Sequence, residues 1–204
     1  MSLFKENSYD IVKLYINQIG ITIFSMFLYT AVPVEDDSLF KTLRILVSVF
    51  SILFYLVLVH NVMWEIGAKD KIRQDSGRYT IPRFKGGFIA LFANIPNLVL
   101  ALASVLFCSL YLGTGAEWCQ SVFAIFFLIM RFHASMYMGL VQGASPASPG
   151  ADAGSAIYVD ALFESVWFLI LPLVAVAITQ LSYWLGTKEI KLLGFLSTKK
   201  PDDK

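Results

Sequence analysis

Long apolar runs alternate with short polar stretches along this chain, and the length of the runs predicts the fold. A bilayer core of about 30 Å needs roughly 20 mostly apolar residues in a helix that rises 1.5 Å per residue. Five segments meet that length: Ile11 to Val34, Leu43 to Trp64, Gly87 to Tyr111, Ser121 to Val141 and Ile157 to Leu185. The pattern therefore predicts an all-α, polytopic transmembrane bundle of about five spans.

The domain organisation follows from the same pattern. Residues 1–186 are predicted to form one transmembrane helical domain, and residues 187–204 a short basic C-terminal tail. Pro172 lies near the middle of the last segment, so this segment is the one expected to break if any does. The alternatives are therefore four full spans plus a broken or re-entrant segment, or six spans.

Composition agrees with a membrane protein. Hydrophobic residues make up 57% of the 204 residues and the mean hydropathy is +0.66, whereas soluble domains contain about 45–50% apolar residues. A formal net charge of +1 argues against a nucleic-acid partner, which requires a clustered basic excess. The lipid bilayer is the partner that composition implies.

Basic residues in the short connections predict the orientation. Six of them follow the second segment: Lys69, Lys71, Arg73, Arg78, Arg83 and Lys85. The positive-inside rule places this predicted loop, and with it the amino terminus, in the cytoplasm of a cell-membrane protein. Five full spans then put the lysine-rich tail outside, against the same rule, so the second half of the chain conflicts with the first.

One charge lies inside the fourth segment, in the stretch "FAIFFLIMRFHASMYMGL". A charged side chain in a span costs about 2.5–3.5 kcal/mol on insertion scales, so Arg131 is expected to face the interior and find a partner. Glu164 is at a matching depth, since the two residues lie roughly 14 and 10 Å from the same surface. Asp160, one turn earlier, is a second possible partner. The pair is either a structural ion pair or part of a functional anion or proton site.

Other polar residues form faces inside the spans. Gln18, Thr22, Ser25 and Tyr29 share one face of the first segment. Asn94 and Asn97 share a face of the third with Ala101, Ser104 and Cys108. Both faces are predicted to point into the bundle, as helix-packing contacts or as the lining of a substrate path. His133 should point away from Arg131, as a packing residue or a proton relay.

Several kinds of chemistry have no recognisable motif. The two cysteines, Cys108 and Cys119, form no CxxC motif, and free thiols are favoured over a disulfide. The sequence predicts no metal site, no cofactor and no catalytic residue, because no nucleophile, base and orienting group recur at a readable spacing. A non-enzymatic protein is therefore expected.

Four strings, "WEIGAKDKIRQDSGRY", "ANIPN", "MYMGL" and "YWLGTKE", together resemble a group of bacterial multi-span membrane proteins of uncharacterised activity. The similarity covers most of the chain from Trp64 onward, although the "GASPASPGADAG" connection is longer than usual. The resemblance implies only a helical bundle in a bacterial inner membrane, and it transfers no catalytic residue.

Two functional classes remain. In the first, the protein is a non-enzymatic membrane component that acts through helix packing with a membrane-protein partner or as a homo-oligomer. In the second, it is a small-solute or ion transporter or channel-like protein with a midplane site around Arg131 and Glu164, near Asn94 and Asn97. A continuous water-filled cavity that reaches Arg131 would favour the second class, and a dry bundle the first.

Overall fold

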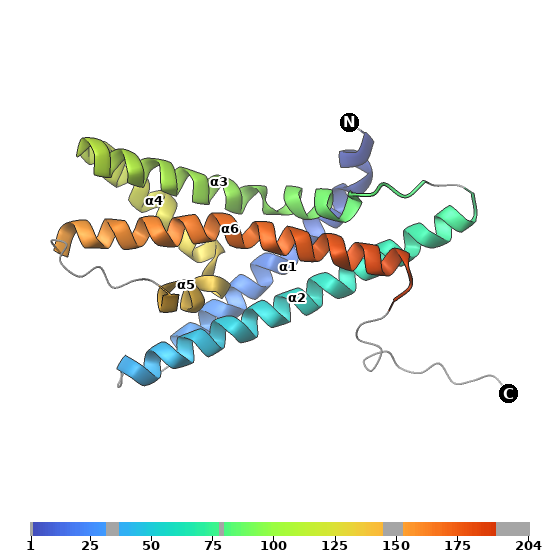
Figure 1. Ribbon diagram of the computed structural model, residues 1–204, viewed down its shortest axis with the longest axis horizontal. Coiled ribbons are helices and arrows are strands. Elements are labelled where there is room, and N and C mark those ends of the chain that lie inside the picture. Colours follow the sequence, from blue (N-terminus) through green and yellow to red (C-terminus); the bar gives the residue numbers. More distant parts are fainter. Residues whose placement is uncertain (1, 32–36, 78–79, 145–152, 191–204) are drawn as a thin grey trace.

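The computed structural model describes residues 2–31, 37–77, 80–144 and 153–190, and within these ranges the chain is all-α, as predicted, without a strand. The helices form an elongated bundle (Figure 1). Their bounds are α1 Ser2–Thr30, α2 Asp37–Asp75, α3 Lys85–Thr114, α4 Glu117–His133, the 3₁₀ turn η1 Ser135–Tyr137, α5 Met138–Ala144 and α6 Ala153–Thr187.

Four of these helices, α1, α2, α3 and α6, are long and apolar enough to cross a membrane. The fourth predicted span, Ser121 to Val141, forms a bent pair instead, in which α4 and the segment from η1 to α5 meet at 76°. The bundle therefore has about five span-like segments, as predicted, of which four are full-length helices and one is broken.

One end of the bundle carries most of the basic residues, and we call it the basic end. It contains the start of α1, the end of α2, the start of α3 and the end of α6 (Figure 1). The Trp64 indole of α2 donates a hydrogen bond of 2.8 Å to the Ile190 carbonyl after α6. At the opposite end, the Cys108 thiol near the end of α3 donates to the Tyr158 carbonyl near the start of α6. Helix α6 therefore begins at the opposite end of the bundle and finishes at the basic end.

The bent pair enters the bundle and returns to the same end. Helix α4 follows directly on α3 at the opposite end, and it stops at His133 beside Asn97, near the middle of α3. Helix α5 then lies against the first turns of α2, because Gly139 contacts the backbone of Arg44. Both arms therefore lie toward the same end of the bundle, and we call these two helices the re-entrant pair. The end of α6 lies at the same end as the Lys69–Lys85 segment, whereas five full spans put it at the opposite end.

The break also lies at a different residue from the one predicted. Helix α6 continues through Pro172, since one proline removes a single backbone donor and the flanking turns pack against neighbouring helices. The break lies instead at Ala134, directly after α4, in a segment without proline. Carbonyl and hydroxyl groups of this segment have partners on α1, which are described below, so non-helical backbone is tolerated at this depth.

The predicted basic loop is largely helical. Helix α2 continues to Asp75, supported by the exposed i,i+4 ion pairs Glu65–Lys69 and Lys71–Asp75. It ends where Gly77 adopts a φ of 71° and its N–H bonds the Gln74 carbonyl. Arg83 lies in the connection, Lys85 begins α3, and Arg78 is outside the described residues.

Glycines allow α6 to lie directly on α2 near the basic end. A Cβ atom at Gly67 would collide with the Tyr183 carbonyl, and one at Gly186 would collide with the Trp64 carbonyl. Close backbone approach through small residues is the usual means of packing helices in lipid, where apolar side chains gain little from leaving the solvent. The predicted 187–204 tail lies mostly outside the described residues, which end at Ile190.

Candidate functional site

The predicted partner of Arg131 is confirmed to be Glu164. The guanidinium donates a bidentate set of hydrogen bonds across α4 and α6, Nε to Oε2 at 3.0 Å and Nη2 to Oε1 at 2.8 Å. Glu164 is buried, with its side chain 7% exposed, whereas the Arg131 side chain is 36% exposed. The charge is therefore neutralised at the site, and the planar fork fixes how α4 docks on α6.

The ion pair belongs to a wider network that the sequence did not indicate. The Gln142 amide of α5 hydrogen-bonds the Glu164 carboxylate, and Arg44 of α2 donates to Gln142 Oε1 at 3.4 Å. The Arg131 guanidinium carbon also lies 4.5 Å from the centroid of the Phe127 ring, a cation–π contact one turn back on α4. A single carboxylate therefore holds both arms of the re-entrant pair.

The backbone at the break is satisfied by α1. Thr22 donates its hydroxyl proton to the His133 carbonyl at 3.0 Å, and Ser135 donates to the Thr22 carbonyl at 2.8 Å. The His133 imidazole Nε2 lies 3.2 Å from the Tyr15 hydroxyl. His133 therefore points to α1 while Arg131 points to α6, as their spacing of two residues predicted.

Helix α5, the second arm of the re-entrant pair, is fixed to the end of α1 and the first turns of α2. The Gly139 N–H donates to the Ser48 hydroxyl at 2.8 Å and also to the Tyr29 hydroxyl, and the two hydroxyls contact each other. A Cβ atom at Gly139 would collide with the Arg44 carbonyl and the Tyr29 hydroxyl. Glycine in the string "MYMGL" is therefore required for the close approach of α5 to α2.

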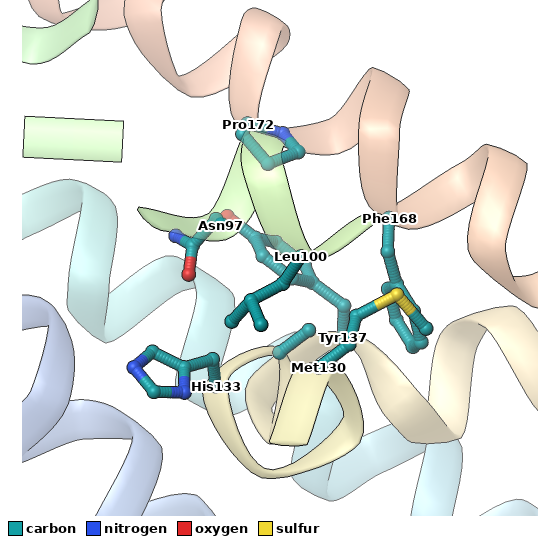
Figure 2. A pocket seen from close by; sticks show the side chains of 8 residues that line it. Asn97, Leu100, Met130, His133, Tyr137, Phe168 and Pro172 are labelled. Atoms are coloured by element: carbon teal, nitrogen blue, oxygen red, sulfur yellow. The ribbon is translucent and has the colours of Figure 1, made fainter. Parts of the chain in front are cut away.

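The two asparagines do not join Arg131. Asn94 donates to the Ala90 carbonyl at 2.9 Å and hydrogen-bonds Tyr55 of α2. Asn97 donates to Asn94 Oδ1 at 3.2 Å, and its own side chain lines a small cavity with His133 (Figure 2). Of the six predicted site residues, Arg131 and Glu164 form the ion pair and Asn97 and His133 line the cavity. Asn94 and Asp160 belong to neither group.

The cavity lies where three helices meet at mid-height. Its walls are side chains of α3, α4, η1 and α6: Asn97, Leu100, Met130, His133, Ala134, Tyr137, Phe168 and Pro172 (Figure 2). Its volume is about 10 Å³, measured as the space open to the centre of a water-sized sphere. This is room for about one water molecule, which is far less than a solute path.

Asp160, the second possible partner of Arg131, lies one turn before Glu164, and its charge acts on that carboxylate. The bidentate contact with the Arg131 guanidinium is nevertheless made by Glu164. Among the described residues, no three His, Cys, Asp or Glu side chains are placed to hold one metal ion. Cys108 and Cys119 are free and buried, as predicted.

The predicted polar faces point into the bundle. Gln18, Thr22 and Ser25 are buried on α1. All five predicted residues on the face of α3, from Asn94 to Cys108, are buried as well. The helical period in the sequence was therefore sufficient to identify the inner faces.

A second buried ion pair lies at the basic end, between residues that the sequence predicted to lie in a cytoplasmic loop. The Lys85 ammonium donates to Asp70 Oδ2 at 2.7 Å, and each side chain is only 3% exposed. The Tyr183 hydroxyl of α6 donates to the same oxygen at 2.8 Å, so one carboxylate joins α2, α3 and α6. Asp70 alternates with lysines along the chain and gave no signal of burial.

Comparison of the chain with protein-family models, with curated proteins and with solved structures finds no match. Any functional conclusion must therefore rest on the geometry alone. The polar groups at mid-height can hold a re-entrant helix pair in place, and the small cavity beside His133 can take a molecule of the size of water.

Proposed function

We propose that the protein is a non-enzymatic, multi-pass component of a cell membrane, with its amino terminus in the cytoplasm. It acts through helix packing with a partner membrane protein or with a second copy of itself. The observation that carries this proposal is that neighbouring helices bind the charge and the exposed backbone groups of the re-entrant pair. Glu164 neutralises Arg131, Thr22 caps the His133 carbonyl, and Ser48 holds Gly139.

The orientation is supported by the re-entrant topology. With α4 and α5 returning to one side, the end of α6 with Lys188 lies at the same end as Lys69, Lys71 and Lys85. The positive-inside rule then points the same way for both halves of the chain, and the conflict seen in the sequence disappears.

The partner surface is expected on the outer faces of the long helices. Large apolar side chains are exposed there, among them Leu53 on α2, Leu106 on α3 and Leu128 on α4. A photo-crosslinking residue at each of these positions, in native membranes, tests the proposal. We expect a discrete protein adduct from one face, either a dimer of the 22.8 kDa chain or one reproducible partner. Lipid adducts alone from every face would contradict it.

A transporter or channel-like protein is the second candidate, and the re-entrant pair itself favours it. Broken helices that meet at mid-depth build the substrate sites of many transporters, and here the tip brings His133 beside Asn97. Reconstituted vesicles with an imposed proton or potassium gradient separate the two candidates. Vesicles that keep their gradient support the non-enzymatic membrane component. Dissipation that is lost in a folded R131M/E164Q variant supports transport.

A further inference from the structure

We propose that the cavity beside the break is a binding site for a single water molecule, which links α3, the tip of the re-entrant pair and α6. The inference is independent of the proposed function, because both a packing component and a transporter can contain such a site. It rests on the size of the cavity, its polar lining and one buried acceptor.

The acceptor is Asn97 Oδ1. This oxygen is buried and receives no hydrogen bond from any protein group among the described residues, and the Asn97 residue is 6% exposed. Its amide nitrogen is already committed to Asn94. Figure 2 shows the amide on the side of the cavity that faces the His133 ring. A buried carbonyl oxygen without a donor is costly, so a donor of the right size is favoured at this place.

The opposite wall offers further polar groups. Pro172 has no N–H, so the Phe168 carbonyl cannot receive its usual i+4 helical bond, and both residues line the cavity. Tyr137 and His133 bring a hydroxyl and an imidazole to the same walls. The His133 ring nitrogens already lie beside the Tyr15 hydroxyl and the Ile129 carbonyl. Asn97 and the α6 backbone are therefore the main acceptors.

The chemistry of the site selects water. A volume of about 10 Å³ for the centre of the molecule is close to the smallest space that holds one water, which needs two to four polar partners. Met130, Leu100 and the Phe168 ring form the rest of the wall and exclude anything larger. No carboxylate lines the cavity, so a metal cation would lack a compensating charge.

The site would explain how the chain tolerates two irregularities at one depth. The proline in α6 and the paired asparagines in α3 each leave a polar group away from bulk water. One shared water beside the tip of the re-entrant pair satisfies both, which is a common use of buried water in helical membrane proteins.

X-ray radiolytic footprinting of the detergent-solubilised protein, read by mass spectrometry, tests the proposal. Radicals formed from a bound water oxidise the buried side chains around it. We expect Met130 and Tyr137 to be oxidised several-fold faster than Met63 and Tyr55, which are also buried but do not line the cavity. Equal rates within the methionine pair and the tyrosine pair would overturn the proposal.

Two variants sharpen the test. Asn97→Leu fills the cavity and removes the acceptor, so oxidation of Met130 and Tyr137 should fall to the level of the controls. Asn97→Ser keeps a polar group and enlarges the space, so fast oxidation should persist. Oxidation of exposed Tyr9 and the thermal unfolding curve report whether each variant is folded. If Asn97→Leu does not fold, the wild-type comparison decides. Unchanged labelling in folded Asn97→Leu would contradict the assignment.

Discussion

Thr22 and His133 lie 111 residues apart in the chain, and the Thr22 hydroxyl donates to the His133 carbonyl at the residue where α4 ends. The return bond from Ser135 to the Thr22 carbonyl makes the contact reciprocal. The break in the fourth apolar segment therefore depends on a neighbouring helix.

Replacement of Thr22 by valine should destabilise the fold by about 1 kcal/mol, because it leaves a buried carbonyl without its donor. Thr179→Val is the matched control. Thr179 is equally buried, but its hydroxyl donates to the Ala175 carbonyl of its own helix, which already has a backbone partner. Reversible unfolding in mixed detergent micelles measures both. A larger loss for Thr179→Val would contradict the capping role of Thr22.

Arg131 and Glu164 should be energetically coupled. Glu164→Gln alone should lower the unfolding temperature, and the double change with Arg131→Met should recover part of the loss, because the unpaired charge is then gone. Since the Arg131 side chain is 36% exposed, we expect a coupling of only about 1–2 kcal/mol in a double-mutant cycle.

The exposed pair Glu65–Lys69 provides the control for that cycle. Its side chains are 54% and 64% exposed, so the corresponding cycle should give a much smaller coupling, because solvent and salt screen an exposed pair. Strictly additive losses at Arg131 and Glu164 would show that the contact contributes nothing to the docking of α4 on α6.

Gly139→Ala should destabilise the protein by about 1–3 kcal/mol, because the new methyl group collides with the Arg44 carbonyl and forces α5 away from α2. Gly20→Ala is the control, since a Cβ at this helical position meets nothing within 4 Å. There the change should be neutral or stabilise by up to about 1 kcal/mol. Similar thermal unfolding of wild type and Gly139→Ala would argue against the close approach.

The buried pair at the basic end should matter more than the exposed charges around it. Asp70→Asn leaves the Lys85 ammonium without its carboxylate at a site that is 3% exposed, so we expect a loss of about 3–5 kcal/mol. Asp75→Asn breaks the exposed pair with Lys71 and should cost less than about 1 kcal/mol. If the two losses measured by chemical or thermal unfolding were equal, Lys85 would not be buried in the folded protein.

The topology predicts which residues an impermeant thiol reagent reaches in intact cells. In a C108S/C119S background, a cysteine at Glu117 should react from outside, while cysteines at Asp75 and Glu189 should react only after permeabilisation. Asp75 and Glu189 on different sides would overturn the re-entrant arrangement. If both react from outside and Glu117 does not, the arrangement stands and the proposed orientation is wrong.

The sequence alone determined that the chain is a helical bundle, which faces turn inward and that Glu164 was the first candidate to neutralise Arg131. These features follow from local rules. A helix of given length and period must bury its polar face, and a guanidinium in an apolar span needs a carboxylate at a matching depth. Glu164 met that condition, and the structure placed it there.

Only the tertiary structure decided where the chain breaks and which charges are buried. Pro172 had the local signal for a break, yet the partners that permit one surround Ala134 and come from α1. Asp70 and Lys85 resemble surface charges in sequence, but glycine contacts at Gly67, Gly86 and Gly186 bring the helices close enough to bury them. In both cases the deciding groups lie on distant parts of the chain, so no local pattern carries the information.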